Sequence, residues 1–155
     1  MKLSQMLEVE DGQNSNLILE NMGIKLYKLA SHDDKRGALR YFEFANFFEF
    51  EIKRYFFISD MPVGQIRGNH AHKKCYQVIH CVGPQIELTL ENLGNKIVLT
   101  LDSSNGLILI PPRIWVTFKS LNSSAILAVF ASELYDQEDY INDYNYFMNE
   151  NHRND

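Results

Sequence analysis

The strongest constraint on the fold is an alternation of apolar and mostly polar residues on either side of one short turn. Apolar residues stand at every second position in two neighbouring runs: Ile86, Leu88 and Leu90, then Ile97, Leu99 and Leu101. The turn sequence 92–95 joins the two runs. A period of two places alternate side chains on opposite faces of a strand. The sequence therefore predicts an antiparallel hairpin with one buried face.

Short strands are predicted along most of the remaining chain. Further candidates occupy residues 25–29, 39–44, 52–58, 70–72, 76–82, 107–110, 115–118 and 125–130. Turn-forming residues separate them, as in the segments 33–37 and 102–106. So many short, evenly spaced strands indicate an all-β sandwich or barrel, and a jelly roll suits the number.

The two ends of the chain lack the strand pattern of the middle. Residues 1–22 are unpatterned and predict a loosely ordered N-terminal arm, which could add one strand to a sheet. One domain is expected over residues 23–150, followed by a tail at 151–155. Asp136 can cap a short C-terminal helix running from Glu138 to about Met148, with its acidic residues on a solvated face. We expect Tyr140, Ile141, Tyr144 and Phe147 to pack inward from this helix.

Composition excludes several classes of protein. The net charge is −5, which argues against nucleic acid or an anionic membrane as the main partner. Residues 53–74 nevertheless carry five basic side chains and one acid, which suits a small anionic ligand. Cys75 and Cys81 are too few for a disulfide framework. There is no signal-peptide core and no run of the ~20 apolar residues that a membrane span needs, so a cytoplasmic protein is predicted.

The segment 67–74 carries the most distinctive chemistry. His70 and His72 stand at positions i and i+2 of a predicted strand and so share a face. They are either exposed histidines on a polar edge or two imidazoles facing the interior of the barrel. Gly64 and the apolar strand that follows favour the second interpretation.

A metal site is the first functional possibility for such a pair. Metal-binding cupins place a glutamate four residues after the second histidine, where this chain has Tyr76. They also end a second segment with a histidine, but the corresponding segment 111–116 of this chain contains none. A catalytic metal usually needs at least three protein ligands, and His80 is the one residue that could complete a set. We therefore predict no metal. Two histidines with a pKa of about 6.5 suit proton transfer beside a ketone, with nearby cations stabilising an enediolate and holding a phosphate.

Five fragments, the histidine segment among them, carry a family resemblance. They are Asp34-Lys35-Arg36-Gly37-Ala38-Leu39, Lys53-Arg54-Tyr55-Phe56-Phe57, Arg67-Gly68-Asn69-His70-Ala71-His72-Lys73, Pro112-Arg113-Ile114-Trp115 and the run from Ala131 to Ile141. In this order, over residues 24–148, they resemble the sugar 3,4-ketoisomerases that act on dTDP-4-dehydro-6-deoxyglucose. The resemblance implies a cupin fold, no cofactor, a homodimer with exchanged strands, and a PLP-dependent 3-aminotransferase acting next in bacterial surface-sugar synthesis.

The same resemblance suggests roles for individual residues. It makes His70 and His72 the catalytic pair. The candidate substrate-binding residues are Arg36, Arg54, Arg67, Tyr76, Trp115 and Lys73. Among these, Trp115 either stacks on the ligand or packs in the core, and Lys73 either contacts a phosphate or is simply exposed.

Two departures from the pattern keep other functions open. Tyr76 replaces a frequent glutamate, and Val116 follows Trp115 where some relatives have histidine. The leading hypothesis is conversion of dTDP-4-dehydro-6-deoxy-D-glucose to a 3-dehydro isomer through an enediol, with the C4 configuration of the product left open. The alternatives are a dTDP-sugar 3,5-epimerase, which also enolises a 4-keto sugar, and a non-catalytic sugar-nucleotide-binding cupin.

Overall fold

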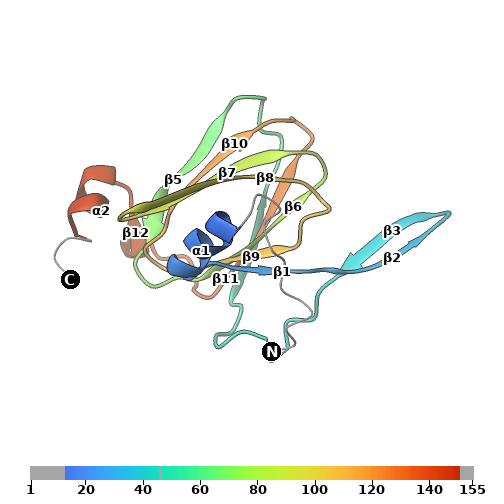
Figure 1. Cartoon of the computed structure of the whole chain (residues 1–155), viewed down its shortest axis with the longest axis horizontal. Helices are drawn as coiled ribbons and strands as arrows, with labels where there is room; N and C mark the ends of the chain where they lie inside the picture. Colours follow the sequence, from blue (N-terminus) through green and yellow to red (C-terminus); the bar gives the residue numbers. More distant parts are fainter. Residues whose placement is uncertain (1–12, 46, 151–155) are drawn as a thin grey trace.

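Two antiparallel five-stranded sheets form the body of the protein. The structure is a computed structural model that describes residues 13–45 and 47–150. In sheet order, the first sheet contains β1 (Lys25–Tyr27), β9 (Leu107–Ile110), β6 (Gln77–Val82), β11 (Ile126–Ala131) and β4 (Arg54–Ile58). The second sheet contains β12 (Tyr140–Ile141), β5 (Ile66–His72), β10 (Trp115–Ser120), β7 (Ile86–Asn92) and β8 (Asn95–Leu101). Figure 1 shows the sheets facing each other.

The main hydrophobic core lies between these sheets. Leu88, Leu90 and Val116 come from the second sheet, and Ile79 and Leu127 from the first, and all are almost completely buried. The predicted hairpin is confirmed as β7 and β8. The predicted all-β class and jelly roll are confirmed. Alternation along the strands gives each sheet one apolar face, and the two apolar faces pack together.

A separate two-stranded hairpin projects from this body. It consists of β2 (Ala30–Asp34) and β3 (Gly37–Tyr41), which pair with each other. Figure 1 shows it extending away from the sheets, on the side opposite the C-terminal helix. Nearly all of its residues are exposed. The sequence predicted a strand at 39–44 but not β2, whose polar residues form no apolar alternation.

The N-terminal expectation needs correction over the part that the structure describes. Residues 13–21 form a helix, α1 (Gln13–Asn21), rather than a loose arm with an added strand. The buried side chains of Leu19 and Met22 join the main core beside β8, which explains why the segment is ordered. The remaining part of the predicted arm, residues 1–12, and the predicted tail, 151–155, lie outside the described residues.

The C-terminal segment also differs from the predicted helix. Asp136 does act as a cap, but of a short 3-10 helix, η2 (Gln137–Asp139). Tyr140 and Ile141 then form β12 on the edge of β5, and helix α2 (Tyr144–Glu150) begins only after that. Backbone pairing to His72 and Ala71 prevents these residues from continuing a helix. Over the described residues, neither helix has the length and apolar character needed to cross a bilayer.

Candidate active site

His70 and His72 lie at the end of β5, on the face turned toward the space between the sheets. His70 stands directly opposite Val116, a core residue, and His72 opposite Tyr140. Their ring centroids are 5.1 Å apart, as expected for positions i and i+2 on one face. His72 is buried and His70 partly so, which makes His70 the more accessible of the two imidazoles.

A β-bulge brings Arg67 onto the same face as the histidines. Arg67 is three residues before His70, so in a regular strand it would point to the other face. The pairing with β10 shifts at this point: His70 pairs with Val116 but Gly68 with Thr117, which leaves Asn69 as the extra residue. Gly68 and Asn69 have φ values of 87° and 55°, a region that glycine and asparagine tolerate best. Arg67 therefore lies opposite the core residue Phe118, on the inner face.

Asp139 is the site residue that the sequence analysis missed. It was assigned to a solvated helix face, yet only 4% of it is exposed. Its Oδ2 lies 2.8 Å from Nδ1 of His72, and its Oδ1 accepts a 2.8 Å hydrogen bond from the backbone N–H of Lys74. The sequence did contain an indication of this role, because Asp139 lies in the last of the five fragments. The helical spacing of the neighbouring apolar residues instead assigned it to the solvent-exposed face of a helix.

Tyrosines and an arginine complete the surroundings of the pair. The ring of Tyr140 lies 5.0 Å from that of His70 and 4.5 Å from that of His72. Tyr135 contacts Tyr140, and the guanidinium of Arg54 lies over the Tyr135 ring at 5.7 Å. The positive charge of Arg54 is close enough to lower the pKa of His72.

Burial controls the protonation of the site. It lowers the pKa of His70 below its ordinary value of about 6.5, although a hydrogen bond to the backbone of Gly68 opposes the shift. Burial also lowers the pKa of His72, against the opposing effect of Asp139. For Asp139, burial raises the pKa, but hydrogen bonds from His72 and Lys74 outweigh it and leave the pKa lowered. At neutral pH the site therefore holds two neutral imidazoles and one carboxylate.

Two buried nitrogen atoms at this site lack a hydrogen-bond partner within the described structure. They are Nε2 of His72 and Nε of Arg54. An unsatisfied buried polar group costs about 1–3 kcal/mol, so such atoms mark positions that a polar ligand or water can occupy favourably. One can accept a hydrogen bond and the other donates, which suits a ligand with both hydroxyl and carbonyl oxygens.

Trp115 does not join this site. It follows Ile114 and precedes the inward-facing Val116, so its side chain points to the opposite face of the sheet. There it packs with Ala71, Ile141 and Phe147, and its ring contacts Tyr144. Of the two predicted roles, this placement favours packing over contact with the ligand, and Trp115 holds α2 against the sheet.

Three other predicted ligand residues also lie apart from the pair. Tyr76 stacks on Phe50, with ring centroids 4.9 Å apart. Lys73 is exposed and close enough to Glu150 of α2 to lower the pKa of that carboxyl. Arg36 lies at the tip of the projecting hairpin, paired with Asp34 and with 90% of its side chain exposed. Within one chain the structure therefore places Arg54 close to His72, and Arg67, which is exposed, on the same face of β5 as the histidines, but it brings none of these three to the pair.

One cluster in the described structure has the composition of a metal site. His72, Cys75 and Asp139 each place a donor atom within 4.8 Å of the others. The hydrogen bond between His72 and Asp139 already explains this proximity, and Oδ1 of Asp139 is occupied by Lys74. His80 cannot extend the set, because it lies on the other face of β6, where it contacts the carbonyl of Gly106. A metal-free site remains our prediction.

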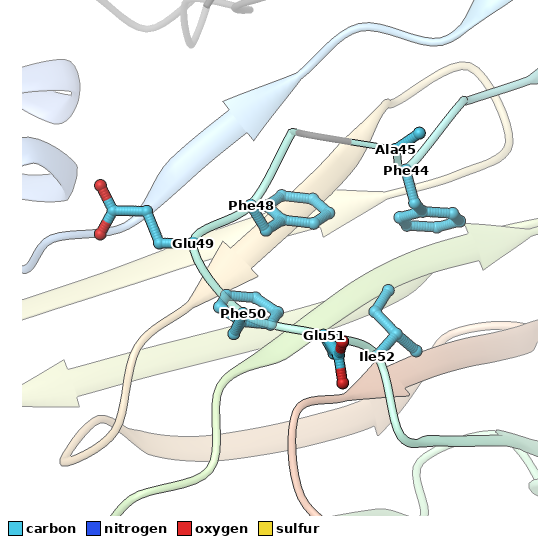
Figure 2. Close-up of a pocket in the computed structure, with 7 residues that line it drawn as sticks. All are labelled: Phe44, Ala45, Phe48, Glu49, Phe50, Glu51 and Ile52. Carbon is cyan, nitrogen blue, oxygen red and sulfur yellow. The ribbon is translucent and has the colours of Figure 1, made fainter.

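Two hollows lie away from the histidine pair. One, of about 490 Å³, is lined by residues of β3, β6 and β11, including Leu39, His80 and Phe130. The other, of about 570 Å³, is lined by Phe44, Ala45 and residues 48–52. Figure 2 shows Phe44, Phe48 and Phe50 around this second hollow, with Glu49 pointing away from the rings. Both belong to the outer side of the first sheet and its neighbouring loop, so neither is the site of the imidazoles.

Comparison with known proteins identifies the family. The family described as "FdtA: WxcM-like, C-terminal" matches residues 22–152. The chain belongs to this family. A curated relative, TDP-4-oxo-6-deoxy-alpha-D-glucose-3,4-oxoisomerase from Aneurinibacillus thermoaerophilus, is 35% identical over 130 residues, covering 83% of this chain and 91% of the relative. The FdtA-family chain described here is accordingly an isomerase.

Solved structures agree with this family and with its fold. A mutant of the 3,4-ketoisomerase QdtA from Thermoanaerobacterium thermosaccharolyticum, in complex with TDP-4-keto-6-deoxyglucose, superposes with a TM-score of 0.78 at 28% identity. The match covers 84% of this chain and 95% of that chain, which confirms the cupin jelly roll. The 3,5-epimerase RmlC from Legionella pneumophila matches less well, with a TM-score of 0.66 at 17% identity over 76% of this chain and 71% of that one. That second likeness extends to the fold alone.

Proposed function

We propose that this isomerase converts dTDP-4-dehydro-6-deoxy-D-glucose into the 3-dehydro isomer, with His70 and His72 as its acid and base. The observation that supports this most directly is the geometry of the pair: two imidazoles lie on one face, 5.1 Å apart, and nitrogens of His72 and Arg54 have no partner among the described residues. The named activity of the relatives and the substrate of the QdtA complex support the same substrate class.

The reaction needs only proton transfer. The carbonyl at C4 acidifies the hydrogen on C3, and a neutral imidazole removes it while the C4 oxygen becomes an enolate oxygen. The proton on the C3 oxygen then moves to the C4 oxygen, and protonation of the C4 carbon leaves a ketone at C3 and a hydroxyl at C4. No electrons are exchanged with an outside reagent. The guanidinium groups of Arg54 and Arg67 are suited to stabilise negative charge on the enediolate and on the diphosphate.

The direct test is product analysis by NMR. The purified protein is incubated with the 4-keto sugar nucleotide in D2O, with and without a PLP-dependent 3-aminotransferase to trap the product. We expect a C3 ketone and deuterium on the ring. A ketone that stays at C4 with inverted neighbouring centres would indicate an epimerase instead. Tight binding without turnover would indicate a non-catalytic protein, and a stoichiometric metal in elemental analysis would contradict the metal-free mechanism.

Activity should fall on the acid side of neutrality. A base must be neutral to accept a proton, and burial lowers the pKa of both histidines. As the pH falls, kcat/KM should therefore be lost at an apparent pKa below about 6.5, which belongs to the pair rather than to either residue. A pH profile between about pH 5 and pH 8 measures this value. A midpoint above the ordinary histidine value would show that the pair is not held in its neutral form.

We further propose that the active form is a homodimer in which the projecting hairpin of each chain covers the other. A lone two-stranded hairpin is marginal in water, yet β2 and β3 are almost fully exposed within one chain. The outer face of the first sheet beside them exposes Tyr55 and Phe57, each at 57%. An exchanged hairpin would cover this apolar face. It would also carry Arg36 away from its own chain toward the site of the partner.

This dimer makes a specific prediction. Phe57→Asp should convert the protein to a monomer, because it places a charge within the proposed contact. Val98→Asp is a matched control, since Val98 is similarly exposed, at 52%, but lies on β8 of the other sheet. Sedimentation velocity measures the change. A wild-type monomer, or a dimer that both variants leave intact, would contradict the proposed surface.

A further inference from the structure

Asp139 and His72 form a buried pair that joins distant parts of the chain. The side chains of His72 and Asp139 are 4% and 3% exposed, and the residues are 67 positions apart. The carboxylate accepts from Nδ1 of His72 on one oxygen and from the backbone N–H of Lys74 on the other. Cys75 adds a second backbone hydrogen bond to the carboxylate. Nε2 of His72, in contrast, is buried with no partner among the described residues.

Several backbone contacts fix Asp139 in this position. Asp136 caps the preceding 3-10 helix through a 2.9 Å hydrogen bond from the N–H of Glu138. The carbonyl of Asp139 accepts a 2.8 Å hydrogen bond from the N–H of Lys73, and Tyr140 then pairs directly with His72. Backbone hydrogen bonds thus fix the chain both before and after Asp139. The fold therefore sets the distance between its carboxylate and the imidazole.

We propose that Asp139 is a positioning residue that keeps the proton of neutral His72 on Nδ1 and leaves the lone pair of Nε2 available to the substrate. The argument rests on the proposed isomerase function. A carboxylate can only accept, so Nδ1 must donate to it, and a neutral imidazole has a single N–H. Nε2 is therefore an acceptor. That is the form a general base requires, and because no described residue bonds to Nε2, a group that enters the site can do so.

The ring of His70 is oriented by a different contact, which is local in the sequence. Its ring hydrogen-bonds to the backbone of Gly68, two residues earlier in the same bulge. The two histidines are thus oriented independently, one by the bulge and one by Asp139. A change at Asp139 should alter the tautomer of His72 without moving the substrate-facing ring of His70.

Asp139→Asn tests this role because the surrounding hydrogen bonds determine how the amide must lie. The backbone N–H groups of Lys74 and Cys75 need an acceptor, so the amide oxygen should stay beside them. The amide NH2 then faces Nδ1 of His72 and donates to it, which moves the imidazole proton to Nε2. We expect kcat to fall by on the order of 10²-fold or more, with KM and dTDP binding changed little.

Nitrogen NMR of labelled protein reads the tautomer directly. Wild-type His72 should show a protonated Nδ1 and an unprotonated Nε2, and Asp139→Asn should reverse them. Glu138→Gln is the matched control, because it makes the same carboxylate-to-amide change at an exposed neighbour and should leave kcat and the tautomer unchanged.

Each outcome decides the proposal. A wild-type His72 protonated on Nε2, or an Asp139→Asn variant that keeps both tautomer and kcat, would overturn it. The wild-type spectrum is decisive even if the variant fails to fold. If wild-type protein shows the expected tautomer but no ketone migration, the proposed function fails while the positioning role of Asp139 stands.

Discussion

Replacing His70 with asparagine should reduce the rate of ketone migration and of solvent-deuterium incorporation by about 10²–10⁴-fold, the usual contribution of a positioned acid or base. Asparagine keeps a polar side chain of similar reach but cannot accept a proton near neutral pH. His70 is the more exposed member of the pair and faces Tyr140, so its removal deletes the proton-transfer group nearest to solvent. The rates are measured by NMR of the sugar ring in D2O.

Ligand binding separates this effect from a loss of structure. Titration of the variant with dTDP should give a dissociation constant within a few-fold of the wild-type value, because the imidazole is proposed to act on the sugar ring rather than on the nucleotide. Thermal unfolding should show an intact fold. Retention of wild-type deuterium exchange by a folded His70→Asn variant would refute the proton-transfer role, whatever its effect on product release.

The sequence was most informative where side chains alternate regularly. The run from Ile86 to Leu101 specified β7, β8 and their register, because only one face of that hairpin is apolar. The spacing of His70 and His72 similarly fixed their common face. These predictions succeeded because, in a regular strand, the face on which a side chain lies follows from local sequence alone.

Periodicity was a poor guide where backbone geometry departs from a regular repeat. The family resemblance made Arg67 a candidate, but alternation alone would place it on the opposite face, because the bulge at Gly68 and Asn69 shifts the alternation by one residue. Around Asp139, apolar residues at helical spacing concealed a 3-10 turn and a short edge strand. The pairing of Tyr140 with His72 is a long-range interaction, so local periodicity cannot reveal it.

The bulge itself makes the second prediction with a large effect. Gly68 has a φ of 87°, and a Cβ built there would lie 2.6 Å from the carbonyl oxygen of Val116, a backbone atom that cannot rotate away. Gly68→Ala must therefore separate β5 from β10 or remove the bulge, and either change displaces His70. A displacement of about 1 Å at a reacting group can cost on the order of 10²-fold in rate. We expect at least that loss in kcat/KM.

A second glycine isolates the steric part of this effect. Gly94, in the β7–β8 turn, has a similar φ of 84° but no atom within 4 Å of an added Cβ. Gly94→Ala should thus cost only the left-handed backbone penalty, about 1–2 kcal/mol in the free energy of unfolding, and leave kcat/KM unchanged. Gly68→Ala should lose more stability than this in urea titrations, since it adds a backbone clash to the same penalty. Equal effects of the two substitutions on stability and on kcat/KM would show that the bulge does not position His70.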